Sequence, residues 1–565
     1  MASRHRPDAG PHARGSHIRG GTDRMTSFKV NLIPAELLNR LGTDQLVLLC
    51  NEDLDSRVLG TIDFDPSSLQ EIDGLESLSD LRRREGVYSI TSTVMRLTPT
   101  VIRDATDGFE QPEEIASELQ ALLDREEQVS VVYVVTHFNH KPLEEMTIFV
   151  GGDCYRTGRE IKDLESVLTR TKNLAQAMIR KAVLVFPDIP ALHGGKKGEW
   201  IIVDRMGRKI EGISEAAIIA LGTLLIPTGI KFLNQYKELL AKQKGIYDSF
   251  PLQNSIRPDT ASPDVLSGPN WRTMCDIWAK RGVNLAFVTC LPQHLGGPIV
   301  PSAYPTGYGA VATAMKLVEH RLADTPRSDL RFLLEALGGV GQATVEALIE
   351  EKGISADQIV AFDKSPEVCR LVSERYGIRT LTMTSNRFYE SLASDGKYNV
   401  WINNGEGDNT RPEHVQKLLD CGVRIFCGAA NNFLKLTDDE IRSPDHLKRE
   451  SLEKIFAAGG WAWPDEATSG GGWTLAVIDV LTRAKGERSS TEAAKRQILE
   501  TIIARNEMLV DTVVGAVTTN GKADGEAVWH HVEHIINERV EATLRREIHP
   551  NEIIAAADVT RWRLA

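Results

Sequence analysis

A glycine-rich turn at 335–343 (EALGGVGQA) constrains the fold of this chain more than any other stretch. It follows an apolar, strand-like run at 329–335 and opens a helix-like run at 341–352, and a second strand-like run follows at 358–362. A strand, a glycine turn, a helix and another strand in this order are typical of a βαβ unit in a parallel sheet. We therefore expect a nucleotide-binding α/β domain in this part of the chain.

The turn also has the chemistry of a dinucleotide site. Glycines allow a tight turn and let backbone N–H groups approach a pyrophosphate at the N-terminus of the helix. The next strand is followed by an aspartate 22 residues after the last glycine of the turn, where an acidic side chain would bind the adenosine ribose hydroxyls. We favour this function over a purely structural turn and expect the cofactor to contact Gly338, Gly339, Val340, Gly341 and Asp363.

One residue of the turn departs from the G-x-G-x-x-G pattern. A strict register places Ala336 at the first glycine, followed by Gly338 and Gly341. An alanine fits such a turn only if its backbone keeps a negative φ. We therefore expect a negative φ at Ala336 and a slightly altered phosphate loop.

Composition limits the class of protein. The 565 residues carry a formal net charge of −12, which disfavours nucleic acids and anionic membranes as main partners. No run approaches the roughly 18 uninterrupted apolar residues of a membrane span, and the most apolar stretch, 216–230, is expected to be core. Seven scattered cysteines without CxxC or zinc-type spacing predict no metal site and a reducing, cytoplasmic location.

The chain divides into segments of different character. We expect strands at 129–135 and 147–151, a helix at 163–184, a loop at 251–268 and mostly helices after residue 472. The predicted fold is α/β, with an N-terminal α/β substrate or catalytic domain, a Rossmann-type dinucleotide-binding domain and C-terminal helices. The expected boundaries are a disordered tail or leader at 1–28, an N-terminal extension at 29–145, the substrate domain at 146–310, the Rossmann domain at 311–465 and a helical segment at 466–565.

Two adjacent lysines, Lys196 and Lys197, stand among glycines at 194–198 (GGKKG). An amine buried beside another cation has a lowered pKa and can polarise a carbonyl or exchange protons. A second lysine can hold a carboxylate by charge-assisted hydrogen bonds. On these residues alone, a solvated surface loop is the better interpretation, and only the surrounding motifs reverse it.

Those motifs occur in one fixed order along the chain and resemble the glutamate/leucine/phenylalanine/valine dehydrogenase family over roughly 147–480. The resemblance lies in their shared order rather than in any single motif. The matching segments are 178–181 (MIRK), 194–198 (GGKKG), 261–264 (ASPD), 305–309 (PTGYG), the glycine turn, 428–432 (GAANN) and 468–472 (TSGGG).

The resemblance implies roles for individual residues. Lys181 would pair with the substrate α-carboxylate, and Lys197 would be the catalytic lysine, with Lys196 at the variable position of G-G-x-K-G. Asp264 would shuttle protons to and from the amine as general acid/base. The residues implied to lie beside the nicotinamide are Thr306, Ala430, Asn431 and Asn432.

The implied reaction is the reversible oxidative deamination of an L-α-amino acid to a 2-oxo acid and ammonium. Asp363 favours NAD over NADP as cofactor, because a carboxylate accepts a hydrogen bond from the ribose 2′-hydroxyl and repels a 2′-phosphate. The adjacent Lys364 softens that preference and keeps NADP open. A homo-oligomer acting in amino acid metabolism is also expected.

The segments around the substrate differ from the family in spacing. The interval from Lys181 to Lys197 and the interval from there to Asp264 are both longer than is usual, which leaves the substrate open. Glutamate-specific relatives carry a lysine before an upstream glycine pair. Here that pair is Gly151 and Gly152, preceded by the uncharged Val150, so an apolar or aromatic substrate side chain is expected unless an arginine such as Arg156 supplies the charge.

Three other interpretations remain open. The chain could be another nicotinamide-dependent oxidoreductase acting on a related carbonyl or imine, or a non-catalytic, nucleotide-binding regulatory relative. The presence of both Lys197 and Asp264 favours an enzyme over the second. The enlarged N-terminal segment could also be an effector or partner module, although the simpler interpretation is that it is a structural part of the catalytic domain.

The lysine assignment is testable in the full chain. Lys197→Ala is expected to lower turnover by orders of magnitude while cofactor binding persists, because the polarising amine is lost. Lys196→Ala, the matched control, should retain most activity. Steady-state rates and cofactor titration measure both quantities, and the opposite pattern would contradict the assignment.

Overall fold

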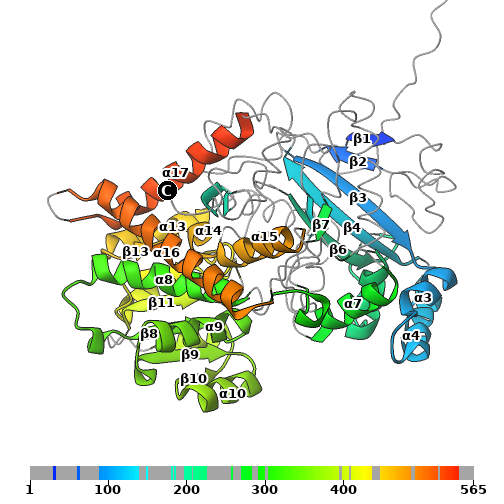
Figure 1. The fold of residues 1–565 in the computed structure, drawn as a ribbon, viewed down its shortest axis with the longest axis horizontal. Helices are drawn as coiled ribbons and strands as arrows, with labels where there is room; N and C mark the ends of the chain where they lie inside the picture. The colour runs from blue at the N-terminus through cyan, green and yellow to red at the C-terminus, as the bar shows by residue number, and fades with distance from the viewer. Residues whose placement is uncertain are drawn as a thin grey trace, which may run out of the picture.

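The computed structural model describes two α/β bodies, one around an antiparallel sheet and one around a parallel sheet (Figure 1). None of the helices in the described part of the chain combines the length and apolar character needed to cross a membrane. The described residues are 29–32, 60–63, 88–126, 128–138, 148–150, 180–181, 183–185, 196–206, 208–225, 256–258, 269–282, 285, 291–298, 303–392, 398–405, 407, 409–435, 446–484, 490–519 and 522–545.

The antiparallel sheet combines strands from both sides of residue 145. Its order is β1-β2-β3-β4-β6, and every neighbouring pair is antiparallel. Strands from the expected N-terminal extension thus share one sheet with the strand that contains Lys197. The bounds are β1 (Lys29–Leu32), β2 (Gly60–Asp63), β3 (Tyr88–Arg96), β4 (Ser130–Phe138) and β6 (Lys196–Val203).

Helices pack their apolar faces into the core of this body. The helix at 215–225 buries six apolar side chains from Ala217 to Leu225, which confirms as core the described part of the most apolar stretch of the sequence. The strands predicted at 129–135 and 147–151 are confirmed by β4 and β5, but the loop expected at 251–268 contains a short strand, β7, paired with β5. The remaining elements here are α3 (Pro99–Thr106), α4 (Pro112–Arg125), β5 (Ile148–Val150), β7 (Ile256–Pro258), α7 (Pro269–Lys280) and η6 (Gln293–Leu295).

The parallel sheet has the strand order β10-β9-β8-β11-β12-β13. Renumbered along the chain this is 3-2-1-4-5-6, the order of doubly wound dinucleotide-binding sheets, in which ligands bind where the order reverses, here between β8 and β11. The Rossmann-type fold predicted from the glycine turn is therefore confirmed. The strands are β8 (Phe332–Glu335), β9 (Ile359–Asp363), β10 (Arg379–Thr382), β11 (Val400–Asn403), β12 (Ile425–Gly428) and β13 (Trp461–Ala462).

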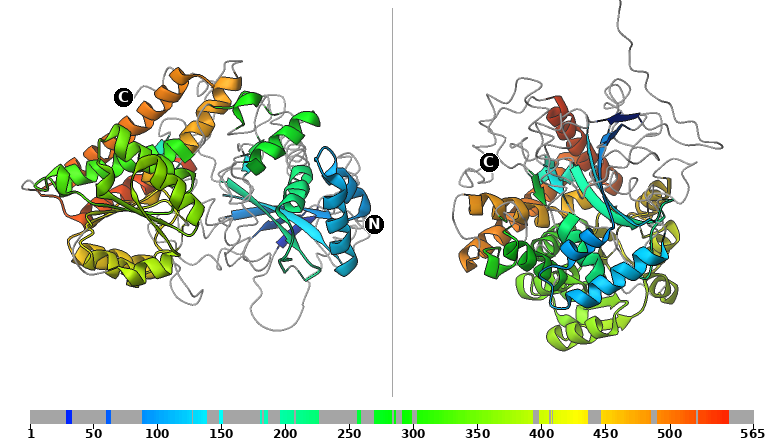
Figure 2. Two further views of the ribbon diagram at one scale, coloured as in Figure 1. Left: turned by 90° about the horizontal axis from the view of Figure 1, so that it is seen from below. Right: turned by 90° about the vertical axis from the view of Figure 1, so that its right-hand side faces the viewer.

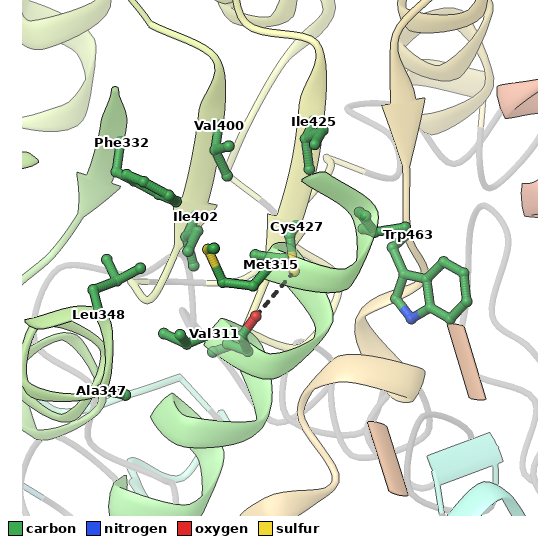
Figure 3. Close-up of a cluster of buried hydrophobic side chains, with 14 of the residues drawn as sticks. Val311, Met315, Phe332, Ala347, Leu348, Val400, Ile402, Ile425, Cys427 and Trp463 are labelled. Atoms are coloured by element: carbon green, nitrogen blue, oxygen red, sulfur yellow. Dashed lines mark hydrogen bonds between the residues drawn. The ribbon is translucent and has the colours of Figure 1, made fainter. Parts of the chain in front are cut away.

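Helices cover both faces of this sheet (Figure 2). On one face, Val311 and Met315 of α8 pack against apolar side chains of the central strands, including Phe332 and Ile402 (Figure 3). The helical elements are α8 (Ala303–Arg321), η7 (Arg327–Asp329), α9 (Gly339–Glu346), η8 (Ala347–Glu351), η9 (Ala356–Gln358), α10 (Pro366–Tyr376), α11 (Ser385–Ser391), α12 (Pro412–Asp420), α13 (His446–Ala457), α14 (Asp465–Thr468), α15 (Gly471–Ala484), α16 (Glu492–Val517) and α17 (Gly525–Arg545).

Helix α8 approaches its neighbours closely through small residues. A Cβ added to Gly307 would lie 2.7 Å from the Ala343 Cβ of α9, and one added to Gly471 would lie 2.1 Å from the Pro305 carbonyl oxygen. The 305–309 motif is therefore packed between the glycine-turn helix and α15. This packing fixes where Thr306 lies relative to both.

The expectation for Ala336 is wrong. Its φ is +65°, in the left-handed region. The turn demands this conformation because the Ala336 N–H donates to the Phe362 carbonyl at 2.8 Å while its own carbonyl faces Gly341, where an added Cβ would lie 2.1 Å away. Alanine thus occupies a position that favours glycine, at a cost of roughly 1–2 kcal/mol.

Ala336→Gly is expected to raise the free energy of unfolding by up to about 1 kcal/mol, because relief of left-handed strain exceeds the added flexibility of the unfolded chain. Chemical denaturation measures it. The control is Ala347→Gly, at a right-handed position (φ −64°), which should destabilise by about 1 kcal/mol or more. Equal destabilisation by both variants would refute the strain at Ala336.

Candidate active site

The glycine turn forms a cradle at the carboxyl end of β8. Gly338 precedes α9 with φ −59° and ψ −170°, and no atom of the described residues lies within 4 Å of a Cβ added there. Gly341, by contrast, is packed against the turn's own backbone. The open side of Gly338 and the N–H groups of the first turn of α9, which have no acceptor within their own helix, suit a phosphate group.

Asp363 stabilises this cradle directly. One carboxylate oxygen accepts the Leu337 N–H at 2.8 Å, and the other accepts the Ser365 N–H at 2.8 Å. A carboxylate offers about four acceptor positions, so hydroxyl donors could still bind. Asp363 therefore joins the end of β9 to the glycine turn, in addition to the ribose contact expected from the sequence.

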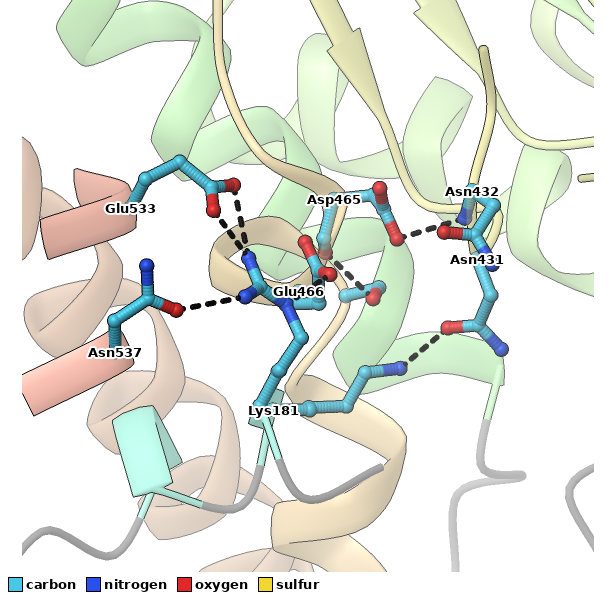
Figure 4. A network of polar contacts seen from close by, with 9 residues as sticks. Lys181, Asn431, Asn432, Asp465, Glu466, Glu533 and Asn537 are labelled. Atoms are coloured by element: carbon cyan, nitrogen blue, oxygen red, sulfur yellow. Dashed lines mark hydrogen bonds and ion pairs between the residues drawn. The ribbon is translucent and has the colours of Figure 1, made fainter. Parts of the chain in front are cut away.

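Lys181 lies at the junction between a short helix and the parallel sheet. The Lys181 side chain is only 6% exposed, and its Nζ donates to Asn431 Oδ1 at 2.7 Å (Figure 4). Asn431 belongs to the turn that follows β12. The residue expected to hold the substrate carboxylate and a residue expected beside the nicotinamide therefore meet in one place.

The next residue of that turn contacts a buried acid. The Asn432 N–H donates to Asp465 Oδ2 at 2.8 Å, and Asn432 itself has φ +50°, which asparagine tolerates. Burial, followed by the charge of Glu466, raises the pKa of Asp465 to about 7, although Lys448, the Asn432 N–H and Lys181 lower it. Asp465 can therefore exchange a proton near neutral pH.

The neighbouring Glu466 has the opposite character. Burial raises its pKa, but the charge of Arg180, then that of Lys448, outweighs burial and sets the pKa at about 2. Arg180 Nε lies 2.8 Å from Glu466 Oε1, and both side chains are almost completely buried. The pKa values of these two adjacent carboxyl groups are thus shifted in opposite directions, so that Glu466 stays ionised while Asp465 titrates near neutral pH.

Thr306 connects the start of α8 with the start of α15. Its hydroxyl accepts the Gly472 N–H at 2.9 Å, and Thr306 is 9% exposed. Asn506 of α16 adds bonds to the Gly309 and Thr468 carbonyls at 2.9 and 3.3 Å. The 305–309 and 468–472 motifs are therefore packed together.

Other expected site residues are placed only by their backbone or not at all. Lys196 and Lys197 begin β6, paired with His137 and Thr136, and Val150 ends β5. Asp264, Gly151 and Gly152 lie outside the described residues, as does most of the helix expected at 163–184. Their roles stay predictions.

Three residues of the site were missed by sequence reasoning: Arg180, Asp465 and Glu466. Asp465 and Glu466 follow the apolar run 461–464 (WAWP) and precede the glycines at 470–472. An acidic pair in such surroundings is a signal for buried charge, since carboxylates are rarely buried without a partner. No local pattern identifies Arg180 as that partner.

Comparison with known proteins finds solved structures that resemble this chain in fold. No protein-family model matches the sequence, and no curated protein matches it. Solved structures similar to the chain include L-tryptophan dehydrogenase from Nostoc punctiforme (15% identity, 74% of this chain and 93% of that one, TM-score 0.40) and hetero-hexameric glutamate dehydrogenase from Thermus thermophilus (17%, 74% and 86%, 0.48). Glutamate dehydrogenase from Peptoniphilus asaccharolyticus is another (16%, 80% and 99%, 0.43).

The raised pKa of Asp465 predicts a pH effect on stability. An acid whose pKa is raised on folding loses stability as pH rises from its unfolded value, 3.8, to about 7. Asp465→Asn removes that loss and can still accept the Asn432 N–H. Relative to the unmodified protein, the variant should gain roughly 3 kcal/mol between pH 5 and pH 8.

Urea unfolding at several pH values measures this difference. Glu466 does not obscure it, because its pKa of about 2 confines its effect to more acidic solution. Asp204→Asn is the control, since hydrogen bonds hold the pKa of Asp204 below 3.8 despite some burial, and its difference should stay flat over that range. If the difference in free energy of unfolding between Asp465→Asn and the unmodified protein is also independent of pH, the raised pKa of Asp465 is ruled out.

Proposed function

We propose that this chain is an NAD(P)-dependent amino acid dehydrogenase. The reaction converts an L-α-amino acid, water and NAD(P)⁺ to a 2-oxo acid, ammonium, NAD(P)H and a proton. The observation that carries the proposal is the contact of Lys181 with Asn431, which brings a buried ammonium to the carboxyl end of β12 beside the titratable Asp465. An amine that can bind a carboxylate and a group that can exchange a proton thus lie next to the parallel sheet.

The chain's own residues fit a dinucleotide. The open side of Gly338, the N-terminus of α9 and the Asp363 carboxylate lie at the switch point of the sheet. Asn404 lies at the same edge, and its side-chain nitrogen is buried without a hydrogen-bond partner among the described residues. A cradle with an unused donor suits the anionic pyrophosphate.

Each residue is assigned a distinct task. Lys181 holds the substrate carboxylate, Lys197 polarises the carbonyl or activates the attacking water, and Asp264 moves protons to and from the amine. A bound nicotinamide ring supplies the hydride acceptor for the Cα hydrogen. Asn431 orients the Lys181 ammonium before substrate arrives, which lowers the cost of fixing that long side chain on binding.

The finer features of the proposal follow from single residues. The Asp363 carboxylate favours NAD, because a 2′-phosphate would meet a negative charge there, and Lys364 softens that preference. Val150 offers no charge to an acidic side chain, which favours an apolar or aromatic amino acid. We also propose that the protein assembles as a homo-oligomer.

The test uses the full chain with a panel of apolar, aromatic and acidic 2-oxo acids, each with ammonium and NADH or NADPH. Ammonium-dependent oxidation of NADH with apolar or aromatic 2-oxo acids is expected. Lys181→Met should raise KM for the 2-oxo acid by a factor on the order of 100, because a hydrogen bond to a charged group is worth about 1.5–3 kcal/mol. NADH affinity should be unchanged.

Lys352→Met is the control, since Lys352 pairs with Glu507 at 2.6 Å away from the site and its loss should leave KM unaltered. Turnover without ammonium dependence would indicate a different oxidoreductase. Nucleotide binding without turnover on any 2-oxo acid would contradict the proposed enzymatic activity. Preference for 2-oxoglutarate would overturn the substrate class alone.

A further inference from the structure

The short helical segment that carries Lys181 is held by the C-terminal helices. Residues 180–181 and 183–185 contact α14, α16 and α17, which lie about 280 to 360 positions later in the chain. We propose that Arg180 is a positioning residue, and that Glu533 and Asn537 of α17 act through it to place the Lys181 ammonium at Asn431. The inference rests on the proposed function, in which Lys181 binds the substrate carboxylate.

Arg180 uses its whole guanidinium group for this contact. Its Nη2 lies 2.8 and 2.7 Å from the two carboxylate oxygens of Glu533, its Nη1 donates to Asn537 Oδ1 at 3.2 Å, and its Nε donates to Glu466 at 2.8 Å (Figure 4). The planar guanidinium fixes direction as well as distance. Because Arg180 precedes Lys181 directly, fixing one side chain fixes the backbone from which the other extends.

The other end of the segment is held too. Arg505 of α16 donates to the Leu184 carbonyl at 2.6 Å, and Arg539 of α17 donates to the Val183 carbonyl at 3.5 Å. A Cβ added to Gly470 would lie 2.7 Å from Val185 Cγ2, so the segment packs directly on the residue before α15. Contacts at both ends leave little freedom for the segment to shift along or turn about its axis.

The test leaves Arg180 intact, because its removal would strand the buried Glu466 carboxylate and the half-buried Glu533 carboxylate and risk unfolding. Glu533→Gln and Asn537→Ala weaken the clamp from α17 only. Lys181 is first probed without any substrate, by acetic anhydride labelling of the folded full chain and mass spectrometry of the peptide that carries it. Both variants should raise the Lys181 labelling rate roughly tenfold, since local opening exposes an amine that is otherwise buried.

Glu507→Gln is the matched control, because it breaks another ion pair between a C-terminal helix and the parallel-sheet body, to Lys352, without touching the segment. It should leave Lys181 labelling unchanged. Glu533→Asp retains the carboxylate and should restore most of the protection lost in Glu533→Gln. In the active enzyme, the two clamp variants should raise KM for the 2-oxo acid with little change in kcat or cofactor affinity.

Unchanged Lys181 labelling in Glu533→Gln and Asn537→Ala, with a fall in Tm like that of Glu507→Gln, would overturn the positioning role and leave a structural one. Increased labelling in a protein without activity on any 2-oxo acid would support the clamp while contradicting the proposed function. Because labelling needs no substrate, the two failures are distinguishable.

Discussion

The buried ion pair between Arg180 and Glu466 is the interaction on which the arrangement of the site depends. Charges taken out of water are costly unless they are paired and hydrogen-bonded, so each partner requires the other to be in place. This requirement joins a segment near residue 180 to α14 and, through Glu533, to α17. Lys181 and Asp465 are the immediate chain neighbours of the pair, and they face the same turn after β12. A structural pair thus sets the distance between two chemically useful groups.

Much of the parallel-sheet body follows from local sequence. The apolar runs around the glycine turn predicted β8, α9 and β9, because buried parallel strands read as short continuous apolar stretches. Ala336 escaped this logic. Local propensity assigns it a negative φ, but the fit of α9 against the turn forces a positive one.

The site was predicted only in part, for a physical reason. The order of the glycine, lysine and asparagine motifs resembles a known family, and that resemblance implied roles for Lys181, Asn431 and Asn432. The contact of Arg180 with Glu466 spans 286 positions, and no periodicity or turn chemistry encodes such a pair. The acidic residues at 465–466 within apolar surroundings are the one signal that could have indicated a facing cation, and sequence reasoning did not use it. Lys197 and Asp264 stay predictions of the same motif reasoning.

The turn after β12 shows how two requirements are met by two consecutive residues. Asn431 uses its side chain to orient Lys181, whereas Asn432 uses its backbone N–H to bond Asp465. The left-handed backbone of Asn432 is what separates the two directions, and asparagine adopts that conformation more readily than a branched residue does. Any ligand that draws the Lys181 ammonium away from Asn431 also changes the field at Asp465, since the charge of Lys181 lowers the pKa of that acid. Under the proposed function, carboxylate binding at Lys181 and proton exchange at Asp465 would therefore be electrostatically linked through this turn.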